Sequence, residues 1–196
     1  RFVAGTKAHP DSGYAARYDH ATETAEAGYY AVRLARSGVR VELTAGERAG
    51  LFRLTYPAAD SAGLLVDLAR VLRWDVAWSN LRVVDDSTLT GFHLVNGWAK
   101  ERYTYFAARF SRPLDDYTIM KDGQPVLYNG YRFRSRAEAT GRNLQFHARW
   151  ATRADERILV KVAISAVSTA NALENLAAEI PGWDFDGLRR ATRARW

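Results

Sequence analysis

The 196-residue chain contains no cysteine, and this absence excludes a disulfide framework, a cysteine nucleophile and a thiolate metal site. The sequence also lacks an apolar run of the roughly 18 residues that a membrane span requires, and no signal peptide is visible. GxSxG, HExxH and glycine-rich phosphate-loop patterns are missing as well. The four histidines are too widely spaced to form an HxH or HxxxH pair, so the sequence does not indicate a histidine metal site.

The formal net charge is +6, from 28 basic and 22 acidic residues. Much of the excess lies at 132–136 and between Arg189 and Arg195. The arginines near the chain end suit the C-terminal end of a helix dipole, and charge at 132–136 suits a strand edge or loop. A nucleic-acid-binding domain therefore remains a disfavoured alternative, which would require steeply salt-dependent binding.

Strand patterns dominate the chain from Gly28 to Ser165. Apolar and polar residues alternate in short segments, and Asp85-Asp86-Ser87 and Lys121-Asp122-Gly123 mark hairpin turns. The predicted strands include 29–34, 39–44, 51–56, 64–68, 103–110, 144–148 and 157–165. About a dozen short strands with hairpin turns are typical of an antiparallel β-sandwich.

The pattern changes to helical spacing after the last predicted strand. Ser168 or Thr169 can cap one helix, Pro181-Gly182 ends it, and Asp184 or Asp186 can begin another. We therefore expect a β domain over residues 1–167 and linker helices over 168–196.

The segment 161–196, KVAISAVSTANALENLAAEIPGWDFDGLRRATRARW, closely resembles the end of the N-terminal domain of glycoside hydrolase family 92. Three further stretches agree with the family in the same order, at 18–57, 60–68 and 90–113. The family consists of α-mannosidases, many acting on α-1,2 linkages. The resemblance implies a galactose-mutarotase-like supersandwich that leads through linker helices into an (α/α)6 barrel.

The resemblance also implies how the work is divided in the intact enzyme. An exo-acting, inverting and calcium-dependent enzyme would carry its catalytic acid, its catalytic base and its calcium ligands in the barrel, after Trp196. This chain would then contain no catalytic residue and bind no calcium itself. Its expected partners are the barrel and a mannose-containing glycan, with no nucleic acid and no membrane span, and the expected location is periplasmic or secreted.

The candidate substrate contacts are aromatic residues beside glycines. Phe92, His93 and Trp98 flank Gly91 and Gly97, so their rings could stack on a sugar, although Phe92 and Trp98 could equally fill the sandwich core. His20 is a further candidate because, like His93, it lies in a stretch that matches the family. A stand-alone carbohydrate-binding sandwich is the alternative function.

Two expectations concern packing and charge. The helices are expected to present an exposed apolar surface to the barrel, centred on Leu173, Leu176, Phe185 and Leu188. Trp183 is expected to pack the linker onto its neighbour, so all five are interdomain packing residues. Glycoside hydrolysis needs two carboxyl groups that flank the scissile bond, and no spacing selects such a pair here. Glu42, between Val41 and Leu43, is expected to face solvent.

Overall fold

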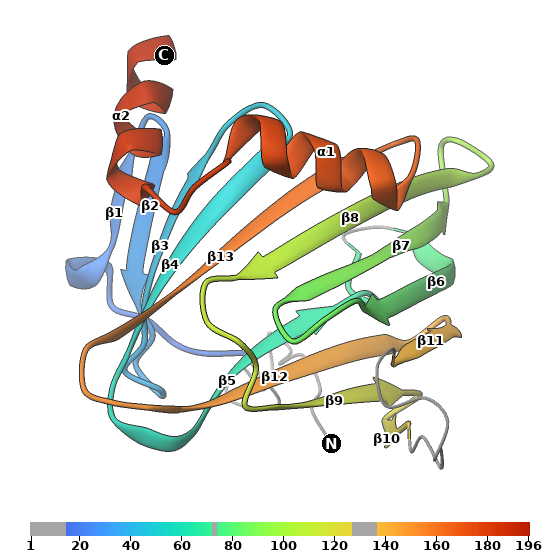
Figure 1. Ribbon diagram of the computed structural model, residues 1–196, viewed down its shortest axis with the longest axis horizontal. Coiled ribbons are helices and arrows are strands. Elements are labelled where there is room, and N and C mark those ends of the chain that lie inside the picture. The colour runs from blue at the N-terminus through green and yellow to red at the C-terminus, as the bar shows by residue number, and fades with distance from the viewer. Residues whose placement is uncertain (1–14, 72–73, 127–136) are drawn as a thin grey trace.

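The computed structural model describes residues 15–71, 74–126 and 137–196. The chain forms three layers: a four-stranded sheet, a nine-stranded sheet and two helices on the outer face of the larger sheet (Figure 1). The sequence-based prediction of an antiparallel sandwich followed by helices is confirmed.

The nine-stranded sheet has the order β1-β2-β3-β4-β13-β8-β7-β6-β11, with every neighbouring pair antiparallel. Its strands are β1 (Thr24–Glu26), β2 (Tyr29–Arg33), β3 (Arg40–Ala45), β4 (Ala49–Tyr56), β6 (Asp75–Val83), β7 (Thr88–Asn96), β8 (Arg102–Phe110), β11 (Glu138–Gly141) and β13 (Glu156–Ser165). A short 3-10 helix, His20–Thr22, precedes β1. The last described strand, β13, is thus central in the sheet, between β4 and β8. The two halves of the sheet are therefore joined only through the end of the β region.

The four-stranded sheet has the order β10-β9-β12-β5. Its strands are β5 (Ala59–Asp67), β9 (Asp116–Lys121), β10 (Gln124–Pro125) and β12 (Leu144–Thr152). Asp122 and Gly123 both have positive φ, 53° and 77°, as the predicted tight turn between β9 and β10 requires. The charged segment 132–136 lies outside the described residues.

The main core lies between the two sheets. Alternate residues of facing strands meet there, and the largest side chains with almost no exposure include Trp150, Phe146, Leu81, Leu89 and Ile158. Strands with one buried face show the period-two pattern that the sequence predicts, as β6 does, whereas β7, β8, β12 and β13 also bury consecutive residues.

The two helices are α1 (Thr169–Glu179) and α2 (Phe185–Arg195). The predicted caps are confirmed: the Ser168 side chain accepts a hydrogen bond from the Asn171 amide, and the Asp184 side chain accepts one from the Gly187 amide. The connection between the helices contains Pro181-Gly182, as expected.

The apolar faces of the helices are turned inward onto their own sheet. Leu176 is 1% exposed and Phe185 is 3% exposed, in a second core with Tyr29, Leu51 and Ala163. The other predicted packing residues divide: Leu188 packs against this second core, Leu173 is half-buried, and Trp183 is 37% exposed under the Lys161 ammonium, 4.6 Å from its ring centroid. The prediction of an exposed apolar surface is wrong for Leu176 and Phe185, because the sheet beneath the helices covers them. Packing of the helices against a barrel stays a prediction.

A charged network holds α2 on the sheet. Glu42 is 6% exposed and accepts hydrogen bonds from the Tyr29 hydroxyl and from Arg53 Nε and Nη2, each at 2.8 Å. Arg53 also donates to Asp186 of α2 at 3.0 Å, and its guanidinium lies 4.2 Å from the centroid of the Phe185 ring. The prediction that Glu42 faces solvent is wrong, since α2 covers this face of β3.

A buried lysine secures the end of α1. Lys161 of β13 is almost completely buried, and its Nζ donates to the carbonyls of Ile180 at 2.8 Å and of Pro181 and Gly182 at 3.5 Å. Burial lowers the pKa of its ammonium group. Carbonyls at a helix end have no partner within the helix, so the sheet supplies the donor that closes α1.

Candidate functional site

A cavity of about 500 Å³ lies between the β5–β6 connection and the β7–β8 hairpin, and we call it the hairpin pocket. Residues of both segments line it: Arg70, Val71, Trp74, His93, Val95, Gly97, Trp98, Ala99, Arg102 and Thr104. His93 of β7 pairs in register with Thr104 of β8, so neighbouring strands place both side chains at the pocket. The structure therefore brings together two of the predicted substrate contacts, His93 and Trp98.

Trp98 stands at the tip of the hairpin and is 99% exposed, which rules out the alternative that it fills the core. Trp74, on the other wall, packs directly against the backbone of Gly97. A β-carbon at Gly97 would lie 2.7 Å from Cδ2 of the Trp74 indole, so only glycine permits this contact. The indoles of Trp74, which is half exposed, and Trp98 are thus both available at one cavity for stacking on an apolar ring face.

Phe92 lies on the opposite face of the sheet from His93, because successive residues of a strand point to opposite faces. Its ring contacts Tyr103 and Tyr105, with centroid separations of 5.7 and 5.5 Å. Phe92 is therefore remote from the hairpin pocket, and it is only partly buried on the outer face of the nine-stranded sheet.

The hairpin pocket is electropositive. Arg70 and Arg102 line it, and none of the described lining residues is acidic. Burial, and then the nearby Arg102, lower the pKa of His93, so its imidazole is neutral at pH 7. A neutral imidazole donates a hydrogen bond from one ring nitrogen and accepts one at the other, which suits a hydroxyl-rich ligand.

His20 is exposed at the other end of the sheet order, just before the edge strand β1. Its Nδ1 lies 2.6 Å from the Glu23 carboxylate, and its ring meets Tyr18 edge-on at 5.4 Å. The structure does not bring His20 to the hairpin pocket.

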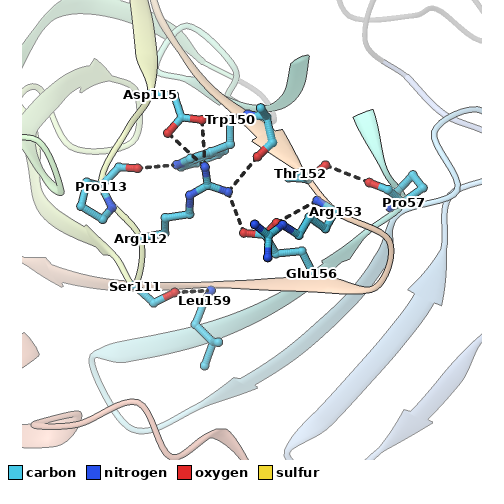
Figure 2. A network of polar contacts seen from close by, with 11 residues as sticks. Pro57, Ser111, Arg112, Pro113, Asp115, Trp150, Thr152, Arg153, Glu156 and Leu159 are labelled. Carbon is cyan, nitrogen blue, oxygen red and sulfur yellow. Dashed lines mark hydrogen bonds and ion pairs between the residues drawn. The ribbon is translucent and has the colours of Figure 1, made fainter. Parts of the chain in front are cut away.

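The best-connected carboxylates are engaged by arginine rather than poised for acid–base chemistry. In the network of Figure 2, Arg112 donates to Glu156 at 2.6 Å, to Asp115 at 2.9 Å and to the Ala151 carbonyl at 2.8 Å. A hydrogen bond from the Arg153 amide, together with Arg112, lowers the pKa of Glu156. The catalytic acid of a glycosidase needs a raised pKa, so this network does not resemble an acid–base pair. Its hydrogen bonds instead join the β8–β9 connection to the β12–β13 hairpin.

The described residues contain no group of three or more His, Cys, Asp or Glu side chains that could hold a metal ion. Thus the described part of this chain does not fit the calcium that the family resemblance implies. Neither described helix is long and apolar enough to cross a membrane.

Comparison with known proteins identifies the domain. Residues 1–165 match the glycosyl hydrolase family 92 N-terminal domain. The chain belongs to this family. The family 92 resemblance in the sequence is thereby confirmed.

The structural relatives agree. The whole chain superposes with a TM-score of 0.93 and 46% identity on a family GH92 alpha-mannosidase from Bacteroides thetaiotaomicron, covering 26% of that protein. A GH92 inverting mannosidase from the same bacterium shares the fold, with a TM-score of 0.77 and 19% identity over 92% of this chain and 23% of its own. An uncharacterized secreted glycosidase of Arthroderma benhamiae is 28% identical over 88% of this chain and 24% of its own length. The chain thus spans about a quarter of the length of the relatives it matches.

Sequence reasoning missed several residues of these surfaces. Neither Trp74 nor Trp78 is among the candidates that the sequence selects, yet both are about half exposed. The alternation of 75–83 holds a signal for Trp78, since it shares a strand face with Asn80 rather than with buried Leu81. The sequence around Trp74 gives no comparable indication, because Trp74 lines the pocket only through its tertiary contact with Gly97.

Proposed function

We propose that this chain is the non-catalytic N-terminal domain of an exo-acting α-mannosidase that removes mannose from glycans. The observation that carries the proposal is the whole-chain superposition, at 46% identity, on a family GH92 alpha-mannosidase. The preference for α-1,2 linkages and the periplasmic or secreted location are parts of the same proposal. The name of the secreted fungal relative supports the location.

In this proposal the chemistry belongs to the barrel of the intact protein. An inverting mechanism needs a carboxylic acid that protonates the leaving oxygen and a carboxylate that activates water from the opposite face. The most buried carboxylate network here, at Glu42, is committed to Arg53, which supports a barrel origin for both groups. Calcium, also assigned to the barrel, would bind the mannose hydroxyls.

The domain's own part would be to brace the barrel and to wall one side of the sugar pocket. The hairpin pocket suits this role, since Trp98 offers a free indole and His93 a neutral imidazole beside it. Phe92 and His20, being elsewhere, would not share in this contact.

The test is an assay on α-1,2-mannobiose of this chain alone and of the full-length polypeptide that contains it. We expect turnover only from the longer protein. Full turnover by the 196-residue chain would overturn the proposed division of labour.

A second candidate function, a stand-alone glycan-binding module, is favoured by the complete exposure of Trp98 beside a cavity. Isothermal titration of this chain with millimolar mannose would test it, with Trp98→Ala as the variant and Trp196→Ala, another exposed tryptophan, as the control. Binding that only Trp98→Ala abolishes would support the module, and flat titrations would dispose of it.

A further inference from the structure

The outer face of the nine-stranded sheet is covered over only part of its width. Helix α1 packs across β13 and β8, and α2 packs on β3 and β4 (Figure 1). Beyond α1, the same face of β6, β7 and β8 carries a group of aromatic side chains that we call the aromatic platform: Trp78, Phe92, Tyr103 and Tyr105.

Strand register explains why these rings gather. Phe92 is opposite Tyr105 across β7 and β8, and Leu94 is opposite both Trp78 and Tyr103 in the next rung. Tyr103 and Tyr105 stack with centroids 5.9 Å apart and planes 12° apart, and Phe92 lies within 5.7 Å of both. Phe92, Tyr103 and Tyr105 thus form an ordered group of rings, and Trp78 lies beside it in the same rung as Leu94 and Tyr103.

The platform remains open to solvent in this chain. Trp78 is 45% exposed and Tyr103 is 38% exposed. Among the described residues none hydrogen-bonds to the hydroxyls of Tyr103 or Tyr105. A contiguous exposed apolar patch of this kind marks an interaction surface.

The platform is continuous with the helix packing already described. Tyr105 is next to Ser165 of β13, whose hydroxyl binds Asn171 in the first turn of α1. A groove of about 280 Å³ runs between Tyr103 and this end of α1, and Val167, which is largely exposed, lines it. An element seated on the platform would therefore also contact α1 and extend the helical layer.

We propose that the aromatic platform and this groove are the docking surface for helices of the catalytic domain of the same polypeptide. The proposal rests on the proposed function. We expect a helical occupant because α1 already covers the adjoining strip of the same face. Its source is the same polypeptide, because relatives of about four times this length contain further chain. Tyrosine and tryptophan supply large contact areas and a polar tip, as the centres of protein interfaces commonly do.

Tyrosine nitration of the unaltered protein tests the proposal directly. In the 196-residue chain, tetranitromethane should modify Tyr103 and Tyr18, the latter being similarly exposed (45%) but near the opposite edge of the sheet. In the full-length protein, peptide mass spectrometry should find Tyr103 protected and Tyr18 still reactive. Equal reactivity of Tyr103 in both proteins would overturn the proposal, and protection of Tyr103 by millimolar mannose in the short chain would instead indicate a sugar platform.

Variants give a second, independent measurement. The double change Tyr103→Ser and Tyr105→Ser removes the contacts among the platform's own rings in both proteins, but it should lower the melting temperature of the full-length protein by at least about 5 °C more than that of the short chain. Tyr18→Ser should change neither. If the double change lowers the melting temperature of the full-length protein no more than that of the short chain, docking is contradicted, even if the protein hydrolyses mannosides. If Tyr103 is protected from nitration in a full-length protein that does not hydrolyse mannosides, only the proposed function is contradicted.

Discussion

The substitution Glu42→Gln tests whether the ion pair beneath α2 stabilises the domain. Glutamine keeps the size of the side chain and one acceptor oxygen, but it removes the charge and replaces the other oxygen by an NH2 donor. Arg53 would therefore lose its ionic partner and the acceptor of one of its two hydrogen bonds to residue 42. Its ion pair with Asp186, whose own side chain is well exposed, would remain.

The expected loss follows from the burial of the pair. Removing one partner of a buried ion pair lowers the free energy of unfolding by about 3 to 5 kcal/mol. Because Arg53 retains its contact with Asp186, we expect a loss of about 3 kcal/mol. For a domain of this size, that loss corresponds to a fall in melting temperature of roughly 6 to 12 °C. The more exposed pair between Glu47 and Arg195, 3.9 Å apart, provides the control, and Glu47→Gln should cost less than about 1 kcal/mol.

The effect should depend on pH in a defined direction. Hydrogen bonds from Arg53 lower the pKa of Glu42 below its ordinary value of 4.5. A carboxylate with a depressed folded-state pKa stabilises the protein above the unfolded-state pKa, and this contribution is lost as the pH falls through the folded-state pKa. The gap between the parent and Glu42→Gln should therefore be complete at pH 7 and should narrow below about pH 4.5.

Thermal unfolding followed by circular dichroism between pH 3 and pH 7 measures both effects. The double variant Glu42→Gln with Arg53→Met completes a cycle, and it should recover part of the loss, since no buried charge then lacks its partner. A Glu42→Gln variant that melts within about 2 °C of the parent at pH 7 would refute the reasoning.

Three further predictions concern separate parts of the fold. Lys161→Met leaves the carbonyls that end α1 without their donor, so amide hydrogen exchange over 180–184, measured by mass spectrometry, should accelerate while exchange in β12 stays unchanged. Gly91→Ala would place a β-carbon 2.1 Å from the Asn80 carbonyl oxygen and should cost about 3 kcal/mol or more in urea unfolding, whereas Gly182→Ala, with no atom within 4 Å, should be neutral. Arg112→Met releases two carboxylates and should cost about 1.5 kcal/mol in the same assay; an unchanged midpoint would show that the network of Figure 2 adds nothing to stability.

The parts of the fold that sequence predicted well are those fixed by near neighbours. Asp122-Gly123 specifies its turn through positive φ, and Ser168 and Asp184 cap their helices through amides three residues away. The same locality explains the strands, since a buried inner face imposes period two on each one.

The errors arose where a distant segment covers a strand. Glu42 alternates with apolar residues and has the pattern of a wet face, but α2, more than 140 residues later, covers it. Leu176 and Phe185 have the pattern of an exposed amphipathic surface, but their sheet is in the same chain. At the candidate site, Trp98 and His93 could be selected from the sequence, whereas Arg70 and Trp74 join them only through tertiary contact.

The distribution of charge and apolar area on the outer face of the large sheet favours a fully covered face. Under the chain's own helices this face carries Arg53 and Lys161, which donate to Asp186 of α2 and to the Ile180 carbonyl at the end of α1. It also carries Glu42, which accepts from Arg53, and the apolar residues of the second core. Beyond α1 it carries rings, among them Phe92 and Tyr103, that are left partly in water. In an isolated domain such rings are unfavourably placed, since burial favours apolar groups and solvent favours charged ones. Further helices over the aromatic half would bury the rings, which would then supply the apolar area of a second contact beside the one under α1 and α2.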